Sequence, residues 1–280
     1  MIFVSDFISL IVKAFEYGLL TKAIIVGIAI AISSAFLGSF LVLKRYSMMG
    51  DGLAHVSFAA LAIALFFNAS PLYVSIPIVS FAAIIILLMN EKAQIHGDAA
   101  IGLISSFSIA LGTIIVTLST GFNVDLFSYL FGNILLVTKT DMWISIITTI
   151  VVIGLVLIFY NELFALTYDE EYAKVLQIKT KRLNYLLAIL TAIVIVVGIR
   201  AVGTMLISSL IIFPTVTAMQ FSLGFKKTIL FATIISVLLI VIGILLSFLL
   251  NLPTGSTIVM LNGILLFIVF VSKKLIYKKG

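Results

Sequence analysis

The chain has 280 residues, of which 63% are hydrophobic and only 10% are charged, and its formal net charge is +6. A soluble domain carries about 25% charged residues, so this composition excludes a soluble globular protein and predicts a polytopic membrane protein. The absence of cysteine excludes disulfides and thiolate metal sites.

The first predicted element is an amphipathic helix at the membrane surface, over residues 1–16, where apolar residues recur at helical spacing. Apolar runs then predict spans at 18–43, 53–67, 72–89, 99–119, 142–160, 183–199, 201–221, 228–250 and 256–272. The run 201–221 contains Gly203 and Pro214, which favour a broken or short helix. We therefore expect one all-α membrane domain, residues 1–280, with about eight or nine transmembrane helices.

Basic residues indicate how the chain is oriented. If the runs alternate across the bilayer, one set of loops receives thirteen of them: Lys44, Arg45, Lys92, Lys174, Lys179, Lys181, Arg182, Lys226, Lys227, Lys273, Lys274, Lys278 and Lys279. The other side keeps Lys13, Lys22, Lys139 and Arg200. Cytoplasmic loops are enriched in Lys and Arg, so the C-terminus is predicted to be cytoplasmic. Since this charge lies in loops beside a lipid bilayer, it does not indicate a nucleic-acid partner.

Asp51 and His55 form the most informative polar pair, at the start of the second apolar run. Residues four apart share a helix face, so one carboxylate and one imidazole would lie together. Both are ligand types that zinc and manganese accept. An ionisable group at membrane depth is costly, so its presence there indicates a functional role. The alternative is structural: Asp51 caps a helix that starts near Gly52, and His55 bonds to a neighbouring carbonyl. His96 is expected to be a solvated loop residue.

Residues 167–182 form the longest polar stretch, predicted to be cytoplasmic. Thr167 or Asp169 could cap a short helix whose first turn is acidic and whose last turn is basic. Tyr172, Val175 and Leu176 would then share one face.

On the external side, residues 121–133 are aromatic-rich and too short to span, and fit either a capping helix over a path or an interfacial aromatic belt.

Other chemistries find little support. The chain has no phosphate-binding Gly-x4-Gly-Lys-Ser/Thr run and no His-Glu-x-x-His zinc protease motif. Asp51 is interpreted as the only acid in or beside a span that has no obvious loop position, whereas an intramembrane aspartyl protease needs two. Transport is therefore favoured over catalysis. One Asp and one His are few ligands for a cation, and two copies of the chain about a two-fold axis would double them.

Several ordered motifs resemble those of the ABC-transporter permeases that import zinc and manganese. They are Gly50-Asp-Gly-Leu-Ala-His-Val-Ser-Phe58, Gly97-Asp-Ala-Ala-Ile-Gly102, Val124-Asp-Leu-Phe-Ser-Tyr-Leu-Phe-Gly132, Arg200-Ala-Val-Gly203 with Pro214, and Leu252-Pro-Thr-Gly255. The resemblance covers nearly the whole chain. The first motif, together with residues 121–132, is more similar to the zinc branch.

The resemblance implies a type II ABC importer-like permease in the bacterial cytoplasmic membrane. It implies a homodimer with separate ATP-binding cassette ATPase subunits and an extracytoplasmic metal-binding protein. Zinc or manganese would be the transported ion, with no permanently bound cofactor. Asp51 and His55 would line the path as metal ligands.

The resemblance also assigns two further groups of residues. The coupling segment that docks on the ATPase would include Asp169, Glu170, Glu171, Tyr172, Lys174, Val175 and Gln177. The region Tyr129, Leu130 and Phe131 would help to close the external side.

Two positions depart from the family pattern. Gln177 stands where relatives often carry glycine, so the coupling helix is expected to continue there rather than turn. Arg200 stands where relatives often have a neutral polar residue, and a cation would repel a divalent metal. Arg200 is therefore expected to face headgroups or the docking protein.

The competing function is a gradient-driven secondary transporter of metal or another cation that uses Asp51 as a proton or ion site. Such a protein would work alone and would show pH-coupled flux without ATP.

Overall fold

The computed structural model describes residues 18–93, 95, 97–118, 132, 134 and 137–277, and these residues contain no β-strand. Their α-helices are α2 (Leu19–Leu43), α3 (Met49–Phe66), α4 (Pro71–Ala93), α5 (Gly97–Leu118), α7 (Lys139–Ile158), α8 (Tyr160–Tyr168), α9 (Glu170–Val175), α10 (Thr180–Val202), α11 (Thr204–Met219), α12 (Phe225–Leu250) and α13 (Thr254–Tyr277). The expected all-α fold is confirmed. The predicted amphipathic helix 1–16 lies outside the described residues.

Eight of the described helices are long and apolar enough to cross a membrane, namely α2, α3, α4, α5, α7, α10, α12 and α13. The run 201–221 instead forms α11, whose 16 residues reach only about 24 Å, less than the hydrocarbon core of about 30 Å. α10 and α11 are separated by Gly203, whose φ of 85° and ψ of 167° only glycine adopts easily. The expectation of a short helix in this run is therefore confirmed.

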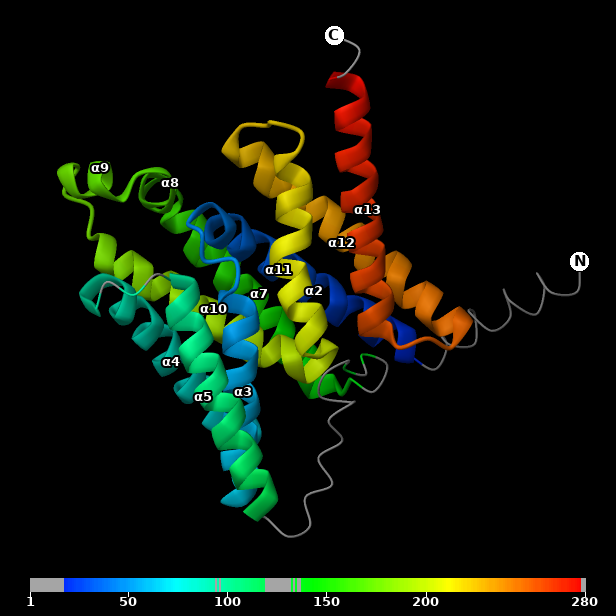
Figure 1. Ribbon diagram of the computed structural model, residues 1–280. Coiled ribbons are helices and arrows are strands. Elements are labelled where there is room, and N and C mark those ends of the chain that lie inside the picture. Colours follow the sequence, from blue (N-terminus) through cyan, green and yellow to red (C-terminus); the bar gives the residue numbers. More distant parts are fainter. Residues whose placement is uncertain are drawn as a thin grey trace, which may run out of the picture.

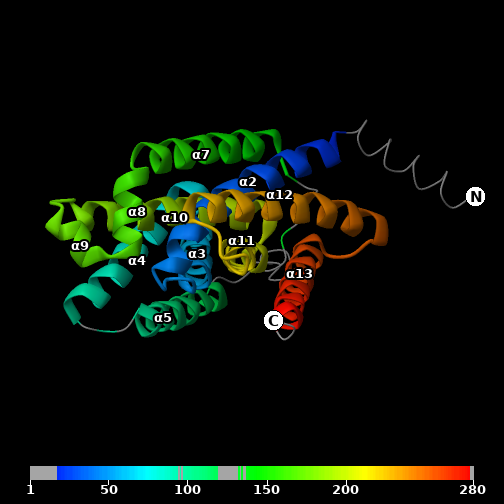
Figure 2. The same ribbon diagram turned by 90° about the horizontal axis from the view of Figure 1, so that it is seen from above.

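The helices form one tilted bundle in which the predicted cytoplasmic parts lie together. Figure 1 shows the C-terminal end of α13, the pair α8 and α9, and the beginning of α12 towards the same side of the molecule. Figure 2 shows α7, α2 and α12 along one side, α5 and α13 apart on the other, and α3 and α11 between them.

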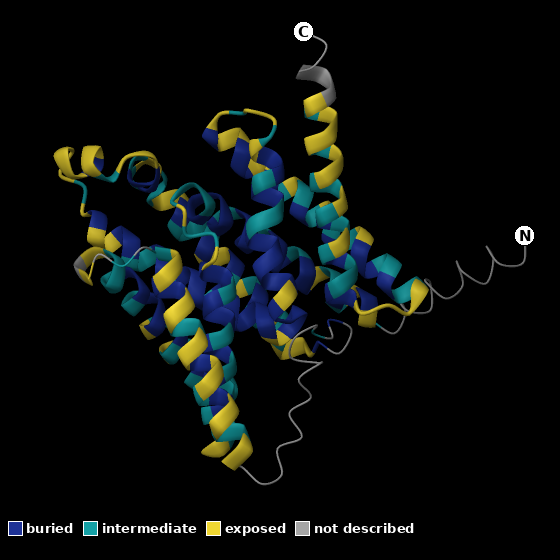
Figure 3. Cartoon of the chain, in the orientation of Figure 1, coloured by how far each residue is buried: buried dark blue, intermediate teal, exposed yellow. Residues whose placement is uncertain are grey.

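Burial separates the central helices from those that face lipid. Figure 3 shows buried residues concentrated on α2, α10 and α11, and exposed residues along α5 and α13. Large apolar side chains such as Phe107 on α5, Ile150 on α7 and Phe267 on α13 are exposed in the single chain. In a bilayer such side chains face acyl chains or a partner subunit, so their exposure is compatible with stability.

Small residues bring the central helices close together. A Cβ atom added at Gly38 of α2 would lie 2.2 Å from the carbonyl oxygen of Ile211 in α11. Between α7 and α2, the hydroxyl of Thr149 donates to the carbonyl of Ala29 at 2.8 Å. Close backbone approach and interhelical hydroxyl bonds are the usual devices of membrane helix packing, where no hydrophobic effect drives association.

Candidate functional site

Asp51 and His55 lie side by side at the beginning of α3. The helix starts at Met49, so Asp51 is in its first turn and His55 is one turn further on. The Nε2 atom of His55 lies 3.7 Å from Oδ2 of Asp51. No side chain caps the N-terminus of α3, and its N-cap residue is Met48, so the alternative in which Asp51 caps the helix is wrong.

The pair belongs to a helix that packs against the bundle rather than to a loop. A Cβ atom at Gly50 would contact Ile211 and Ser208, which belong to the middle of α11. A Cβ atom at Gly52 would lie 2.4 Å from the side chain of Ile101 in α5. The two glycines therefore let the first turn of α3 fit tightly between α11 and α5. Asp51, between them in sequence, lies beside a membrane-embedded helix.

Both side chains of the pair remain accessible in the single chain. The exposed fraction is 51% for the Asp51 side chain and 34% for the His55 side chain. A carboxylate on the surface of a membrane bundle is costly unless it faces water or a partner. Within the described residues, no third His, Cys, Asp or Glu joins them to form a group that could hold a metal ion.

The helix α9 is built as the local sequence predicts at its N-terminus. The Asp169 carboxylate accepts hydrogen bonds from the backbone amides of Glu171 and Tyr172, both at 3.0 Å. Glu170 and Glu171 occupy the first turn and Lys174 the last, as the helix dipole favours. Among the two cap candidates the structure therefore selects Asp169.

The expectation that the helix continues through Gln177 is wrong. α9 ends at Val175, and Gln177 adopts a left-handed conformation with φ of 59°. The amide of Gln177 donates to the Lys174 carbonyl at 3.0 Å, and that of Ile178 donates to Ala173 at 3.1 Å. These two bonds form a Schellman motif, and Ile178 packs against the core. Tertiary packing therefore holds glutamine in a left-handed conformation that glycine adopts more easily.

α9 exposes most of its side chains. Ala173 is its only buried residue, whereas Tyr172 and Val175 on the helix and Leu176 just after it are exposed large side chains. Lys174 pairs with Glu171 at 2.7 Å on the same exposed segment. The three exposed side chains, Tyr172, Val175 and Leu176, are the ones that the sequence predicts on one face of the helix.

A polar tie connects α9 to the turn that precedes α3. Lys44 lies at the C-cap of α2, and its Nζ is 3.5 Å from Oε2 of Glu170 and bonds to the Asn184 side chain. Asn184 on α10 in turn donates to Glu170 at 3.3 Å. The Lys44 side chain is only 9% exposed. Burial lowers the pKa of Lys44, and the nearby Glu170 carboxylate opposes that change.

A second ion pair joins α10 to α7 at the predicted external end. Nε of Arg200 lies 2.8 Å from Oδ1 of Asp141, whose side chain is only 12% exposed. Asp141 also accepts from Thr138 in a capping box at the start of α7. Asp51 is therefore not the only acid at the edge of a span. Arg200 keeps a half-exposed side chain, and its charge is matched by Asp141.

Replacing Arg200 with glutamine is expected to destabilise the protein by about 1 kcal/mol, because the nearly buried Asp141 carboxylate loses its charged partner. The thermal unfolding midpoint in detergent should fall by about 2–4 °C. Lys139→Gln removes a charge two residues from Asp141 and leaves the ion pair intact. Its thermal unfolding midpoint should equal that of the wild type. An unchanged midpoint for Arg200→Gln would contradict a stabilising role for the pair.

Several predicted residues lie outside the described part of the chain. They are the external-gate residues Tyr129, Leu130 and Phe131 and the loop residue His96. Gly132, which follows the gate residues, is described: a Cβ atom there would lie 2.2 Å from the backbone of Val202. Its φ of 65° also favours glycine. The end of the external segment therefore packs against the junction of α10 and α11.

The eight apolar helices among the described residues define a multi-pass membrane protein. The sequence profile of the ABC 3 transport family matches residues 16–273, and the chain belongs to this family. The resemblance drawn from the sequence motifs is therefore confirmed. The chain is a transport permease rather than a catalytic subunit.

Relatives with assigned names cover most of the chain. It is 33% identical over 255 residues to the manganese transport system membrane protein MntC of Listeria innocua, covering 91% of both chains. It is 36% identical over 238 residues to the high-affinity zinc uptake system membrane protein ZnuB of Buchnera aphidicola, covering 85% of this chain and 91% of the relative. The solved structure of PsaBC from Streptococcus pneumoniae in complex with Fab has a TM-score of 0.83 and 30% identity, covering 95% of each chain. These bacterial relatives and the eight apolar spans place the chain in the bacterial plasma membrane.

Proposed function

We propose that this chain is the permease of an ATP-driven importer of divalent transition metal, with zinc as the first candidate and manganese as the second. The observation that carries the proposal is the Asp51–His55 pair, which is accessible on α3 beside the embedded helix α11. Relatives named for zinc uptake and for manganese transport both support it. The motif similarity to the zinc branch gives zinc its precedence.

The geometry of the pair suits a metal in transit. Two ligands about 2.1 Å from a tetrahedral ion are about 3.4 Å apart, close to the 3.7 Å between the His55 and Asp51 atoms. An ion could therefore bind both side chains with little movement. Both side chains are accessible, so the ion would not be closed in, and transport requires that the ion leave again.

A second copy of the chain would complete the path. If two permeases meet about a two-fold axis, two carboxylates and two imidazoles surround one passage. The half-exposed Asp51 side chain would then face this passage instead of lipid. Metal would arrive from an extracytoplasmic binding protein, and the segment with Tyr129, Leu130 and Phe131 would help to close the external side.

ATP would act through the cytoplasmic segment around α9. The exposed Tyr172, Val175 and Leu176 fit a docking surface for a separate ATP-binding cassette ATPase. Closure of the ATPases on ATP would push on this segment, and the two permeases would rock so that the path opens to one side at a time.

Uptake of radiolabelled zinc and manganese into vesicles tests the proposal. Vesicles with the permease, its ATPase and its binding protein should accumulate metal only when ATP is supplied. The ion that is taken up at the higher rate identifies the substrate. Vesicles with the permease alone should take up neither ion. Uptake by the permease alone, driven by a pH gradient, would instead establish the secondary transporter that uses Asp51 as a proton site.

A further inference from the structure

Two adjoining hollows lie where α8 meets the beginning of α12, on the side of the bundle away from α5 and α13. They measure about 510 and 530 Å³ and share Tyr160, Asn161 and Lys226. Together they form one groove, whose shared part carries Lys226 and whose second hollow adds only apolar side chains. The groove is separate from Asp51 and His55, which line neither hollow.

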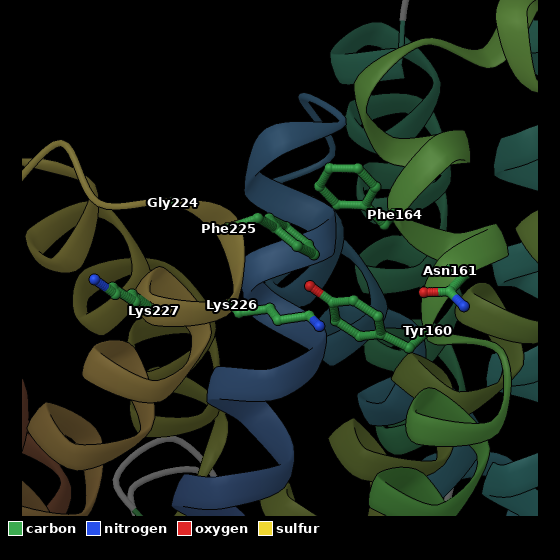
Figure 4. Close-up of a pocket in the computed structure, with 7 residues that line it drawn as sticks. All are labelled: Tyr160, Asn161, Phe164, Gly224, Phe225, Lys226 and Lys227. Carbon is green, nitrogen blue, oxygen red and sulfur yellow. The ribbon is translucent and has the colours of Figure 1, made fainter.

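The part of the groove that the two hollows share is basic. Figure 4 shows Lys226 extending towards Tyr160, while Lys227 extends in the opposite direction from the same turn of α12. Nζ of Lys226 lies 5.2 Å from the centroid of the Tyr160 ring. No ion pair is found for either lysine in the described part of the chain, and no described lining residue is acidic. Gly224 at the N-cap supplies no capping side chain, so the first amides of α12 add positive character.

The other end of the groove is apolar and continues onto the face of two membrane spans. It is lined by Leu157 at the end of α7 and by Ile229 and Leu230 on the first turns of α12. The Leu157 and Leu230 side chains are more than half exposed in the single chain. An occupant with an anionic head and apolar chains would therefore meet complementary surfaces at both ends.

We infer that this groove binds an anionic phospholipid of the cytoplasmic leaflet, whose phosphate lies near Lys226 and Tyr160 and whose chains follow α7 and α12. The position agrees with this occupant, because the distribution of Lys and Arg predicts that the end of α7 and the beginning of α12 lie on the cytoplasmic side. Phe164 stacks on Tyr160 with centroids 6.4 Å apart and also packs on Phe225 at 5.2 Å. The bound lipid therefore braces α8, the element that leads directly into α9.

The test is native mass spectrometry of the purified permease complex titrated with dioleoyl phosphatidylglycerol or dioleoyl phosphatidylcholine. Wild type should retain the anionic lipid preferentially. Lys226→Gln should weaken that binding about fivefold, since one lysine near an anionic lipid contributes an increment of this size. The double variant with Lys227→Gln should weaken it at least as much, and most of the loss should come from Lys226, because the Lys227 side chain extends away from Tyr160. Lys274→Gln removes a cytoplasmic charge from the distant α13 and should bind as wild type does.

Three outcomes would overturn the inference. Equal retention of the two lipids, or unchanged binding in the double variant, would show that the groove does not select an anionic lipid. Competition by glycerol phosphate as effective as by the whole lipid would show that the apolar end is unused and that the site takes a free phosphate. Loss of the ATPase from the double variant with lipid binding intact would assign the groove to the ATPase.

Discussion

Asp51→Asn is expected to abolish ATP-dependent metal uptake, with a loss of at least about 100-fold. The amide keeps the size of the side chain but removes the charge that would hold a divalent ion beside His55. Removing a group that only supports a metal ligand typically costs 10–100-fold, so removing a ligand itself should cost at least as much. Uptake of labelled zinc and manganese into vesicles with the complete transporter measures the loss. His55→Ala should show a similar loss.

The control for this prediction is Glu91→Gln, the same acid-to-amide change at the exposed end of α4. It should transport at the wild-type rate. All variants must still assemble with the ATPase and hydrolyse ATP, so that a loss of uptake reports on the path. Normal uptake by Asp51→Asn and His55→Ala would remove both residues from the path, and the metal site would have to lie elsewhere.

The sequence predicts this candidate site well because the signal is local. Residues four apart on a helix must share a face, so the proximity of Asp51 and His55 follows once α3 is recognised. The cap by Asp169 is equally local, since its carboxylate binds amides only two and three residues away. The apolar runs, for the same reason, predict the membrane spans and the break at Gly203.

Contacts between distant parts of the chain carry no such signal. Lys44 and Asn184 are 140 residues apart, and no periodicity relates them. From the sequence alone, Asp141 is only an acidic residue near the start of a helix. The packing of α7 against α10 brings it to Arg200. At Gln177 the local preference was overridden, because the two Schellman bonds and the packing of Ile178 outweigh the cost of a left-handed glutamine.

The tie between Lys44 and Glu170 offers a route from α9, the proposed coupling helix, to Asp51 and His55, the proposed metal ligands. Glu170 is the first residue of α9, and Lys44 is followed by a short turn that leads directly into α3 at Met49. The turn is itself held by bonds from the Tyr46 amide to Leu41 and from the Met49 amide to Tyr46. Movement of α9 would therefore reach the first turn of α3, which carries Asp51.

Lys44→Met is accordingly expected to reduce metal transported per ATP hydrolysed by about tenfold, within the range of coupling energies that single residues modulate. ATP hydrolysis should continue, because the exposed surface of α9 is unchanged. Glu170→Met should give the same uncoupling and should also lower the unfolding midpoint by about 5 °C, since it leaves the buried Lys44 ammonium without a counter-charge. Parallel assays of uptake and phosphate release measure the ratio.

The double variant Lys44→Met with Glu170→Met separates coupling from stability. Replacing both members of a buried pair with apolar side chains is often nearly neutral for folding, so the unfolding midpoint should recover. The ratio of transport to hydrolysis should stay low, because the directional bond between α9 and the α2–α3 turn is still missing. Lys181→Gln, an exposed charge on the first turn of α10, should leave both quantities unchanged. If transport recovers together with stability in the double variant, the tie serves folding alone and coupling takes another route.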